Sequence, residues 1–405
     1  MTEVVFLGFA LPEDEFRALV ATDAGLPIAT QRFGWSVVEA LESAGWRVFA
    51  LSAAPASDFP HNKRIVFSSG RFSGGSAVSG WLMPFVNVTG LKHLSRYISA
   101  TWGLARRVRR GRTAAIVVHG VHSPFIWAAV HASRWLPVPV VVVMTDPPSL
   151  RTRFDHGVSL AMKRVDRRLI ASGLQRVDGV ITLTPALAGD FAPGKPALLM
   201  EGIARPLRAP GPPSEGAADD APPIALYAGG LREEYGVRAL IDAVGRSRGS
   251  WHLHIYGNGP MADECRHAEA EDPRIFFHGV ADTETLGRAY SRASVLVNPR
   301  QLNTEFVQYS FPSKLLEYMT TSTPVVTTHL PTIPSSWDPF VIYTGEDSAS
   351  IATTLDSTLA LAPEELRHLG SAANTFIADA YSPTAQGARI TAFLRMLSAE
   401  PEAAP

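Results

Sequence analysis

Short apolar runs alternate along the chain with segments whose apolar positions are spaced as in a helix. In the first half these runs are Val4–Leu7, Val48–Leu51, Ile116–Val118, Val138–Met144 and Val180–Leu183. Between the first two, residues 33–44 show helical spacing and end at Gly45, a typical helix terminator. Strands that alternate with helices predict a parallel sheet covered by helices on both faces.

A second alternating series follows residues 206–223, PLRAPGPPSEGAADDAPP, whose Pro, Gly and acidic residues predict an interdomain linker. Its predicted strands are Ile224–Tyr227, His252–Tyr256, Ile275–His278, Val295–Asn298 and Val325–Thr328. Helical spacing lies between them, for example over residues 237–244 and 283–290. We therefore expect two doubly wound α/β domains, residues 1–205 and 224–382, with a ligand cleft between the carboxyl ends of their sheets. A C-terminal helix of about residues 383–398 is expected to pack back on the first domain.

Composition limits the class of protein. With 405 residues and 46% apolar residues, the chain can build a core in each of two domains. A single cysteine, Cys265, fits a reducing compartment. The apolar runs are far shorter than the roughly 20 residues of a membrane-spanning helix. Acidic residues at positions 13–15 stand where a signal peptide would be basic, so we expect a cytoplasmic protein.

Charge is distributed unevenly along the chain. Residues 1–205 hold 23 Lys and Arg against 14 Asp and Glu, and residues 206–405 hold 14 against 24. A basic half fits an anionic acceptor or an acidic membrane surface, and the alternative is an ordinary solvated surface. The run Arg106–Arg112 either ends a helix or docks on lipid headgroups at the inner face of a membrane. Aromatic residues do not interleave with this run, so nucleic acid is not an expected partner.

The most informative stretch is residues 298–328, which places charged and turn-forming residues between two predicted strands. Residues 313–319 have the spacing of a short helix that opens after a proline. A helix N-terminus carries unpaired N–H groups and a partial positive charge, so Ser313 and Lys314 in its first turn suit a phosphate. Glu317, one turn further on, suits sugar hydroxyl groups.

Three other loops of the second half also follow predicted strands, where open α/β sheets bind ligands. In the first, Gly229 and Gly230 let the backbone approach a ligand closely, and Arg232 suits a phosphate. The other two are GNGP, with Gly257 and Gly259, and HGVAD, with Val280. Glycine-rich turns are common after strands, so the inference depends on the loops occurring together.

Taken in order, AGGLREEYG, YGNGP, FHGVADTETLGRAYSRASVLVNPR and SFPSKLLEYM, followed by TPVV, resemble the nucleotide-sugar half of the retaining GT-B glycosyltransferases of family four, the glycosyl transferases group 1. The resemblance covers residues 224–328 well and residues 1–205 more loosely. It implies a GT-B fold, with two Rossmann-like domains facing a central cleft. It also implies transfer of a hexose from a nucleotide sugar to a hydroxyl with retention. The FPSK form resembles a branch associated with surface polysaccharide assembly.

The resemblance also implies roles for individual positions. Donor-binding roles fall on Gly229, Gly230, Gly257, Gly259, Val280, Arg300, Tyr309, Ser313, Leu315 and Glu317. Among these, residues 313–315 correspond to the diphosphate cradle, Glu317 to the ribose ligand and Val280 to the contact with the base. Because the leaving diphosphate gains negative charge as the sugar bond breaks, Lys314 is the expected catalytic cation, with Arg232 beside it.

The chain departs from the commonest pattern of that family at the donor loop. Gly230 and Tyr235 stand where an Arg and a Lys are usual, and Tyr309 stands where the first of two glutamates is expected. Candidates to replace these groups are Arg232, Arg300 and Lys314 for the cations and Glu305 for the carboxylate. We interpret the departures as a subfamily variant, and lost activity is the alternative.

Candidates in the first half follow predicted strands. Asp146 either orients or deprotonates the acceptor hydroxyl, or caps a turn. The family commonly has a His directly before this Asp, and here it is Thr145. His119 and His122 are expected to contact the acceptor. Glu201 stands where many relatives have an Asn that faces the donor.

Metal chemistry is not expected. The chain has no Asp-x-Asp sequence to hold a divalent ion, and His252 and His254, on one face of a strand, are interpreted as structural. We expect no cofactor beyond the substrate, a UDP- or GDP-sugar, and a saccharide or lipid-linked acceptor. A GT-B nucleotide-sugar epimerase and a non-catalytic relative that binds nucleotide or glycan stay open as alternatives. The first strand leads into GFAL and not a G-x-G-x-x-G turn, which argues against a dehydrogenase.

Overall fold

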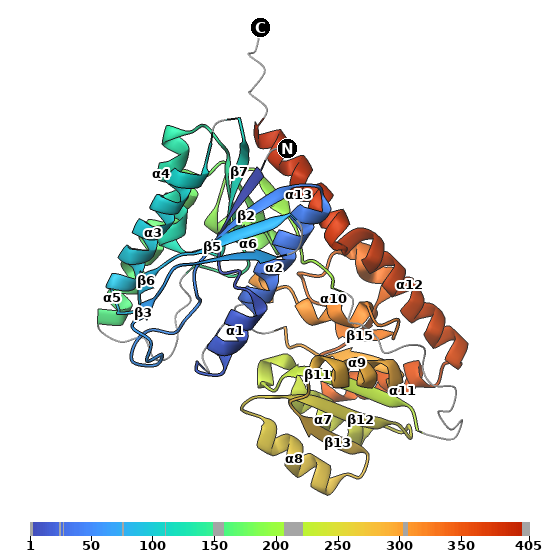
Figure 1. Cartoon of the computed structure of the whole chain (residues 1–405). Coiled ribbons are helices and arrows are strands. Elements are labelled where there is room, and N and C mark those ends of the chain that lie inside the picture. Colours follow the sequence, from blue (N-terminus) through green and yellow to red (C-terminus); the bar gives the residue numbers. More distant parts are fainter. Residues whose placement is uncertain are drawn as a thin grey trace. The chain divides into compact units, whose positions relative to one another are not determined.

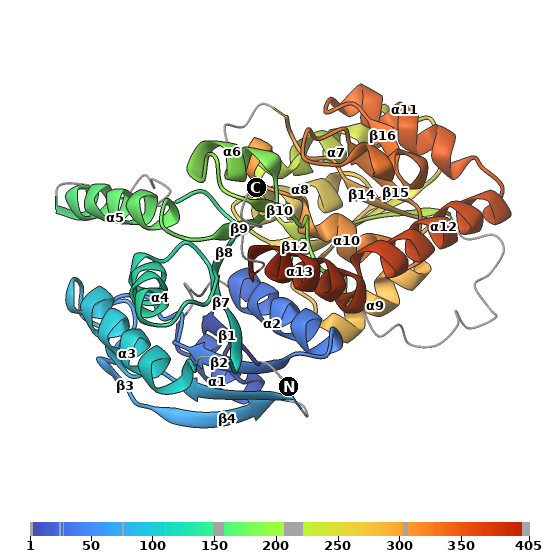
Figure 2. The same ribbon diagram turned by 90° about the horizontal axis from the view of Figure 1, so that it is seen from above.

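The computed structural model describes residues 3–23, 26, 28–74, 77–109, 111–148, 158–205, 222–302 and 307–398, with the backbone alone for 158–160 (Figures 1 and 2). The chain forms two compact units: unit 1 comprises Met1–Ile203 and Pro383–Pro405, and unit 2 comprises Ala204–Ser382. The predicted linker lies outside the described residues except for Pro222 and Pro223. Each unit holds its own sheet and its own core.

Unit 1 is built on an eight-stranded sheet in the order β10-β9-β8-β7-β1-β2-β5-β4. Its strands are β1 (Glu3–Gly8), β2 (Arg47–Ser52), β4 (Gly70–Gly74), β5 (Val78–Leu82), β7 (Thr113–His119), β8 (Val140–Met144), β9 (Gly179–Thr182) and β10 (Ala197–Leu199). All neighbours are parallel except β4 and β5, which form an antiparallel hairpin. A separate antiparallel pair joins β3 (Val66–Phe67) and β6 (Phe85–Val86). The strands predicted for the first half are confirmed, and the hairpin was not predicted.

Two helical layers cover the sheet of unit 1. The helices of the unit are α1 (Glu13–Val20), α2 (Ile28–Ser43), α3 (Leu91–Arg107), α4 (Ser123–Trp135), α5 (Val158–Leu174), α6 (Pro185–Phe191) and α13 (Pro383–Ser398). Successive side chains of a strand point to opposite faces. Val4 and Phe6 of β1 therefore pack in one core with α2 and α13, and Val5 and Leu7 pack in the other with α3 and α4. Figure 2 shows α2 and α13 side by side.

Unit 2 holds a fully parallel six-stranded sheet in the order β13-β12-β11-β14-β15-β16. Its strands are β11 (Ile224–Gly230), β12 (His252–Asn258), β13 (Ile275–Gly279), β14 (Val295–Asn298), β15 (Val325–Thr328) and β16 (Ile342–Thr344). The first five confirm the strands predicted from apolar runs. Because β11 lies between β12 and β14, the chain reverses direction across the sheet beside β11, which is where doubly wound sheets bind ligands.

Helices cover both faces of this second sheet. They are α7 (Val237–Arg246), α8 (Ala262–Glu271), α9 (Thr283–Arg292), α10 (Ser313–Met319), α11 (Ser348–Leu359) and α12 (Pro363–Tyr381), with 3-10 turns η1 (Glu233–Tyr235), η2 (Val307–Tyr309) and η3 (Ser335–Phe340). One core joins the sheet to α7, α8 and α11. On α9 the side chain of Asp282 caps the helix by accepting from the Thr285 N–H at 2.7 Å. Helix α10 has the bounds expected from its proline and its apolar spacing.

Candidate active site

The first glycine loop leaves the carboxyl end of β11 with its backbone against two neighbouring segments. Gly257, at φ 144°, lies so close that a Cβ there would stand 1.8 Å from the Gly229 carbonyl oxygen. A Cβ on Gly236, at φ 76°, would stand 1.7 Å from the Pro299 carbonyl oxygen. Only glycine fits such approaches, so the loop, β12 and the turn after β14 are held together as one surface.

The turn after β14 brings Arg300 over this loop. Its guanidinium carbon lies 5.4 Å from the centre of the Tyr235 ring, and its Nη2 donates to the Ser310 hydroxyl at 3.1 Å. Burial lowers the pKa of Arg300, and the Tyr235, Tyr227 and Glu234 side chains act against that shift. Within the described residues Arg300 forms no ion pair, unlike Arg232, which pairs with Glu234 on the exposed turn.

Tyr318 attaches helix α10 to β11, just before the same glycine loop. The buried Tyr318 hydroxyl donates to the Ala228 carbonyl at 2.9 Å and accepts from the Ala228 N–H at 2.8 Å. These two bonds attach the helix directly to the strand that ends in Gly229 and Gly230. The ring of Tyr318 also packs edge-on against Tyr290 of α9, with centroids 5.5 Å apart.

Two bonds fix the carboxylate of Glu317 in place. Its Oε1 accepts from the Tyr290 hydroxyl at 2.9 Å and from Lys314 Nζ at 2.8 Å. Burial raises the pKa of Tyr290, and the neighbouring Tyr318 and Glu317 add to this, so the hydroxyl stays a donor at neutral pH. Lys314 and Glu317 are both partly exposed, one helical turn apart. Glu317 is thus oriented, and Lys314 is held at the helix start.

Two backbone N–H groups in the first turn of α10 already have hydrogen-bond partners. The N–H of Ser313 donates to the Phe311 carbonyl at 2.9 Å, and the N–H of Leu315 donates to the Pro312 carbonyl at 2.9 Å. The Ser313 side chain is exposed, whereas that of Leu315 is fully buried in the core. Leu315 can therefore face a ligand only through its backbone.

The third loop presents an apolar side chain to solvent. Val280 follows Gly279, which has φ 66°, and its side chain is 76% exposed. Next to it the ring of His278 stacks on Tyr256 with centroids 4.3 Å apart. His278 Nε2 lies 3.1 Å from His254 Nδ1, and burial lowers the pKa of His254 to about 4, with His278 and His252 adding to the shift. His254 therefore takes part in a side-chain hydrogen bond, and the Val280 side chain near it is exposed to solvent.

The remaining predicted donor residues lie nearby in the chain. Gly259 lies against Leu231, where a Cβ would be 2.4 Å from that carbonyl oxygen. Tyr309 ends η2, is partly buried and is separated from the FPSK segment by Ser310. Glu305 lies outside the described residues.

In unit 1 the candidates Asp146 and Glu201 follow β8 and β10. Asp146 is exposed and accepts from the Thr145 hydroxyl at 2.8 Å. Glu201 is only 7% exposed, and burial raises the pKa of its carboxyl despite Arg389 Nη1 at 3.9 Å from Oε2. Asp146 can meet a ligand directly, whereas Glu201 is largely withdrawn.

The two predicted acceptor histidines have different surroundings. His119 is fully buried, its ring stacks on Phe6, and neither ring nitrogen has a hydrogen-bond partner among the described residues. Burial lowers its pKa to about 4. The expectation of a direct acceptor contact does not fit His119, because the last residue of β7 points into the core beside Gly8 and Gly34. His122 precedes α4, with Nε2 3.5 Å from Arg96 Nη1, and its pKa is lowered by burial and then by Arg96.

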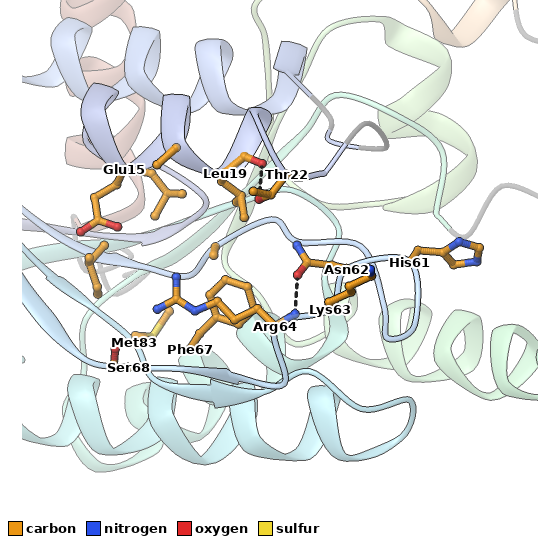
Figure 3. A pocket seen from close by; sticks show the side chains of 14 residues that line it. Glu15, Leu19, Thr22, His61, Asn62, Lys63, Arg64, Phe67, Ser68 and Met83 are labelled. Carbon is orange, nitrogen blue, oxygen red and sulfur yellow. Dashed lines mark hydrogen bonds between the residues drawn. The ribbon is translucent and has the colours of Figure 1, made fainter.

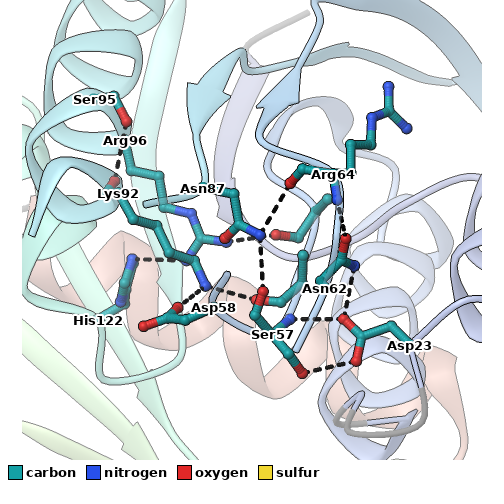
Figure 4. Close-up of polar contacts among 12 residues, drawn as sticks. Asp23, Ser57, Asp58, Asn62, Arg64, Asn87, Lys92, Ser95, Arg96 and His122 are labelled. Carbon is teal, nitrogen blue, oxygen red and sulfur yellow. Dashed lines mark hydrogen bonds and ion pairs between the residues drawn. The ribbon is translucent and has the colours of Figure 1, made fainter. Parts of the chain in front are cut away.

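A buried polar network beside His122 was not predicted (Figure 4). Lys92 and Arg96 of α3 are 5% and 4% exposed. Lys92 Nζ donates to the Ala56 carbonyl at 2.6 Å and pairs with Asp58, and Arg96 Nη2 donates to the Ala54 carbonyl at 2.5 Å. Burial lowers the pKa of Arg96 to about 9. These residues could not be identified from the sequence, because lysine and arginine on a helix are normally expected on its solvent-exposed face.

Further hydrogen bonds extend the network to the start of the chain. The Asp23 carboxylate accepts from the Ser57 N–H at 2.7 Å and from the Asn62 amide at 2.9 Å. The Asn87 amide donates to the Ser57 carbonyl at 2.9 Å and to the Arg64 carbonyl at 3.2 Å. The loop that follows β2 is therefore held by the side chains of Lys92 and Arg96 and also by those of Asp23 and Asn87.

A cavity of about 620 Å³ opens beside this network in unit 1 (Figure 3). Its apolar lining comes from α1, β3 and the residues after β1 and β5, with Leu19, Phe67, Leu11 and Met83. Its polar rim is Glu15, Thr22, His61, Asn62, Lys63, Arg64 and Ser68. Since Leu11 and Ala54 follow β1 and β2, the cavity lies at the carboxyl end of the sheet, where α/β domains bind ligands.

Two further observations concern metals and membranes. The described part contains no group of three His, Cys, Asp or Glu side chains placed to share a metal ion. Among the described residues, no helix combines the length and the apolar character needed to cross a bilayer.

The fold is similar to those of several solved glycosyltransferases. A sucrose-phosphate synthase from Thermosynechococcus elongatus is 16% identical, with a TM-score of 0.65 over 98% of this chain and 99% of that one. A UDP-forming α,α-trehalose-phosphate synthase from Burkholderia xenovorans is 10% identical, with a TM-score of 0.66 over 99% and 100%. HepE of Anabaena in complex with UDP is 12% identical, with a TM-score of 0.60 over 98% and 100%. At such identities the likeness concerns the fold, and it confirms the predicted GT-B class of two Rossmann-like domains.

Family comparisons match both units. A search of curated proteins with the sequence found no match. Residues 30–194, in unit 1, match the glycosyl transferase 4-like domain, and residues 222–360, in unit 2, match the glycosyl transferases group 1. The two matches take in most of the chain and agree with the glycine loops and the α10 segment of unit 2. Taken together, the two family matches support a group 1 glycosyltransferase.

Proposed function

We propose that the protein transfers a hexose, with retention and without a metal ion, from a UDP- or GDP-sugar to a hydroxyl of a saccharide or lipid-linked acceptor. We infer that the protein acts in the cytoplasm, in the synthesis of a polysaccharide or glycoconjugate of the cell surface. The observation that carries the proposal is the fixed Glu317 carboxylate, one turn into α10, a helix that Tyr318 attaches to β11 just before the glycine loop. A carboxylate, a lysine and a glycine loop within one small surface are what a nucleotide sugar requires.

Binding of the nucleotide is assigned to Glu317 and Val280. The hydrogen bonds from Tyr290 and Lys314 both end on Oε1 of Glu317, so Oε2 is the oxygen we assign to the ribose hydroxyls. The exposed Val280 would pack on the base. UDP is our first choice of nucleotide because HepE was solved with UDP and the trehalose-phosphate synthase is UDP-forming.

Stabilisation of the leaving diphosphate is assigned to cations near α10. Cleavage of the sugar–phosphate bond leaves negative charge on the diphosphate, and a cation already in place stabilises that charge in the transition state. Lys314 is the principal catalytic candidate and would turn from Glu317 toward the phosphates. Arg300, which lies over Tyr235, supplies the charge that the usual family lysine would have supplied there. Arg232, paired with Glu234, is the secondary candidate.

The acceptor is assigned to unit 1. Asp146 is the exposed carboxylate at the end of the most apolar strand, and it can orient the attacking hydroxyl. The cavity of about 620 Å³ offers an apolar lining and a polar rim in which Lys63 and Arg64 outnumber Glu15, which suits an acceptor with both an apolar and an anionic part. These features favour a lipid-linked saccharide.

The test is a panel of UDP- and GDP-sugars incubated with the protein, with and without lipid-linked saccharides. Transfer to acceptor with the anomeric configuration kept is the expected result, and protection from thermal unfolding should be greatest with one nucleotide. Conversion of the donor without acceptor would instead identify an epimerase. If no nucleotide protects the protein and no donor is consumed, the proposal is wrong.

A non-catalytic nucleotide-binding relative is the second candidate. It is favoured by Gly230 and Tyr235 in place of the usual cations and by the engagement of Arg232 with Glu234. Tight UDP binding without transfer to cell-derived acceptors would support it over the enzyme.

A further inference from the structure

The first half of helix α3 shows the reverse of normal amphipathicity, whereas its second half buries Ala100 and Leu104. The first half buries Lys92 and Arg96 against the loop after β2, as described above. The outward face of α3 carries a row of apolar side chains, namely Leu91 (54% exposed), Leu94 (55%), Ile98 (57%) and Trp102 (48%). The spacing of three, four and four residues places them along one side of the helix. Contiguous exposed apolar surface of this kind marks an interaction site.

An aromatic and cationic groove continues the row at the C-terminal end of α3. It is a cavity of about 530 Å³ between α3 and the β4–β5 hairpin, lined among others by Trp81, Trp102, Arg71 and Arg106. The two indole rings lie 5.0 Å apart, and the Arg106 guanidinium carbon is 3.5 Å from the Trp102 ring centre. Tryptophan and arginine together are typical of the boundary between lipid tails and headgroups, where one end of a side chain is apolar and the other polar.

Charge on the same helical layer is almost entirely positive. Helix α3 carries four Lys and Arg, of which Lys92 and Arg96 are buried and Arg107 pairs with Glu3, whereas α4 carries one and α5 four, against a single acidic residue of these helices, Asp166. Beyond α3, Arg109 and Arg112 are also exposed. Further apolar side chains stand out from this layer: Trp135 (85% exposed), Met162 (36%), Val165 (55%) and Leu169 (44%). Apolar residues set among cations complement a surface that is apolar inside and anionic outside.

We propose that the outer face of α3, with the Trp81–Trp102 groove, docks on an anionic lipid bilayer. Leu91, Leu94 and Ile98 enter the boundary between headgroups and acyl chains, and Trp102 lies at headgroup level. Arg106 and Arg109 contact lipid phosphates. A second copy of the chain is a poorer occupant, because a two-fold contact would set this positive layer against itself. The proposal concerns binding alone and does not depend on the proposed transfer reaction.

The experiment measures partition of the full chain onto phosphatidylcholine vesicles with and without phosphatidylglycerol. We expect binding to the anionic vesicles that weakens as salt is raised. The variants Leu94→Ser/Ile98→Ser and Arg106→Gln/Arg109→Gln should each lower the partition coefficient about tenfold or more, since they remove apolar contact and phosphate attraction respectively. These positions are exposed, so circular dichroism and the melting temperature should stay as in the parent protein.

Matched controls carry the same chemical changes on other surfaces. Leu361→Ser/Met396→Ser removes two exposed apolar side chains, and Arg266→Gln/Arg288→Gln removes two exposed cations from unit 2. Both controls should bind like the parent protein. Equal binding to neutral vesicles, or loss of binding in the controls to the same extent, would overturn the proposal. A dimer in vesicle-free solution that the Leu94→Ser/Ile98→Ser change abolishes would also overturn it. Binding to an acidic protein in the absence of any binding to anionic vesicles would do the same.

Discussion

At the scale of single residues, the ion pair between Lys314 and Glu317 is the most directly testable feature of the site. If Lys314 neutralises the leaving diphosphate, Lys314→Ala should lower kcat by about 10²–10³-fold, the usual effect of losing one transition-state contact. The fold should be unaffected, because a partly exposed pair one turn apart contributes about 0.5 kcal/mol or less. Single-turnover kinetics and a melting curve of the same preparation measure both effects.

The matched control for Lys314 is Arg288→Ala, which breaks a comparable pair with Glu284 on α9. This control should leave both kcat and the melting temperature nearly unchanged. A Lys314→Ala enzyme with the parent kcat would remove Lys314 from the catalytic group and transfer that role to Arg300.

His119 makes the stability of unit 1 depend on pH. Burial lowers its pKa from 6.5 to about 4, so between these values the unfolded chain binds a proton that the folded chain does not. Acidification through this window therefore favours unfolding, by at most about 3 kcal/mol for this one group. In His119→Leu the free energy of unfolding should fall less between pH 6.5 and pH 4 than in the parent protein.

Urea titrations across that pH range measure the difference. The exposed His267 provides a control, because His267→Gln removes a histidine that is not enclosed by the fold. Parallel pH profiles for the parent protein and His119→Leu would show that the buried ring does not cause the acid sensitivity.

At the scale of elements, the link between α10 and β11 depends on the Tyr318 hydroxyl. Tyr318→Phe leaves the buried N–H and carbonyl of Ala228 without this partner, which we expect to cost about 2–3 kcal/mol. Because these bonds join α10 to the strand that leads into the glycine loop, KM for the donor should rise as well. Tyr343→Phe is the control, since its hydroxyl donates to Asp338 at the surface and its loss should cost under about 1 kcal/mol.

The glycine loop offers a second element-scale test. Gly236 and Gly111 have nearly equal φ, 76° and 74°, but a Cβ would strike the Pro299 carbonyl at Gly236 and meet nothing within 4 Å at Gly111. Gly111→Ala should cost only the left-handed backbone penalty of about 1–2 kcal/mol. Gly236→Ala should cost clearly more and weaken donor binding. Equal losses of stability would show that the close approach at Pro299 relaxes freely.

Some elements were predictable because local rules and tertiary packing agree there. Helix α10 follows a proline and buries residues at helical spacing, so its bounds could be derived. The β4–β5 hairpin was missed because its strands are partly exposed and contain glycine, which removes the alternation on which strand prediction depends. The direction of the His119 side chain was also beyond the sequence, because the pattern gives the strand but not which face its last residue joins. Lys92 and Arg96 were missed because burial of cations depends on distant carbonyls.

At the scale of the whole molecule, net charge and the candidate site residues divide between the units. The nine cations and one acid of α3, α4 and α5 account for most of the positive excess of residues 1–205. Net charge of each half could be counted from the sequence. The concentration of positive charge on one helical layer could be recognised only from the fold, because these helices are separated by buried strands along the chain. The candidate donor residues, apart from Glu201, lie in unit 2, whereas the candidate acceptor residues and the larger cavity lie in unit 1.

This division predicts that the nucleotide stabilises one part of the molecule. In differential scanning calorimetry we expect two transitions, and UDP at about 100 times its Kd should raise one of them by roughly 5–10 °C, the shift that about 2.7 kcal/mol produces in a domain of this size. Gly387→Ala should lower the other transition, because its Cβ would stand 2.0 Å from the Ala40 carbonyl where α13 packs on α2 in unit 1. Gly189→Ala, on α6 with nothing within 4 Å, is the control and should not lower either. If Gly387→Ala lowers the transition that UDP raises, the donor does not bind to unit 2 alone.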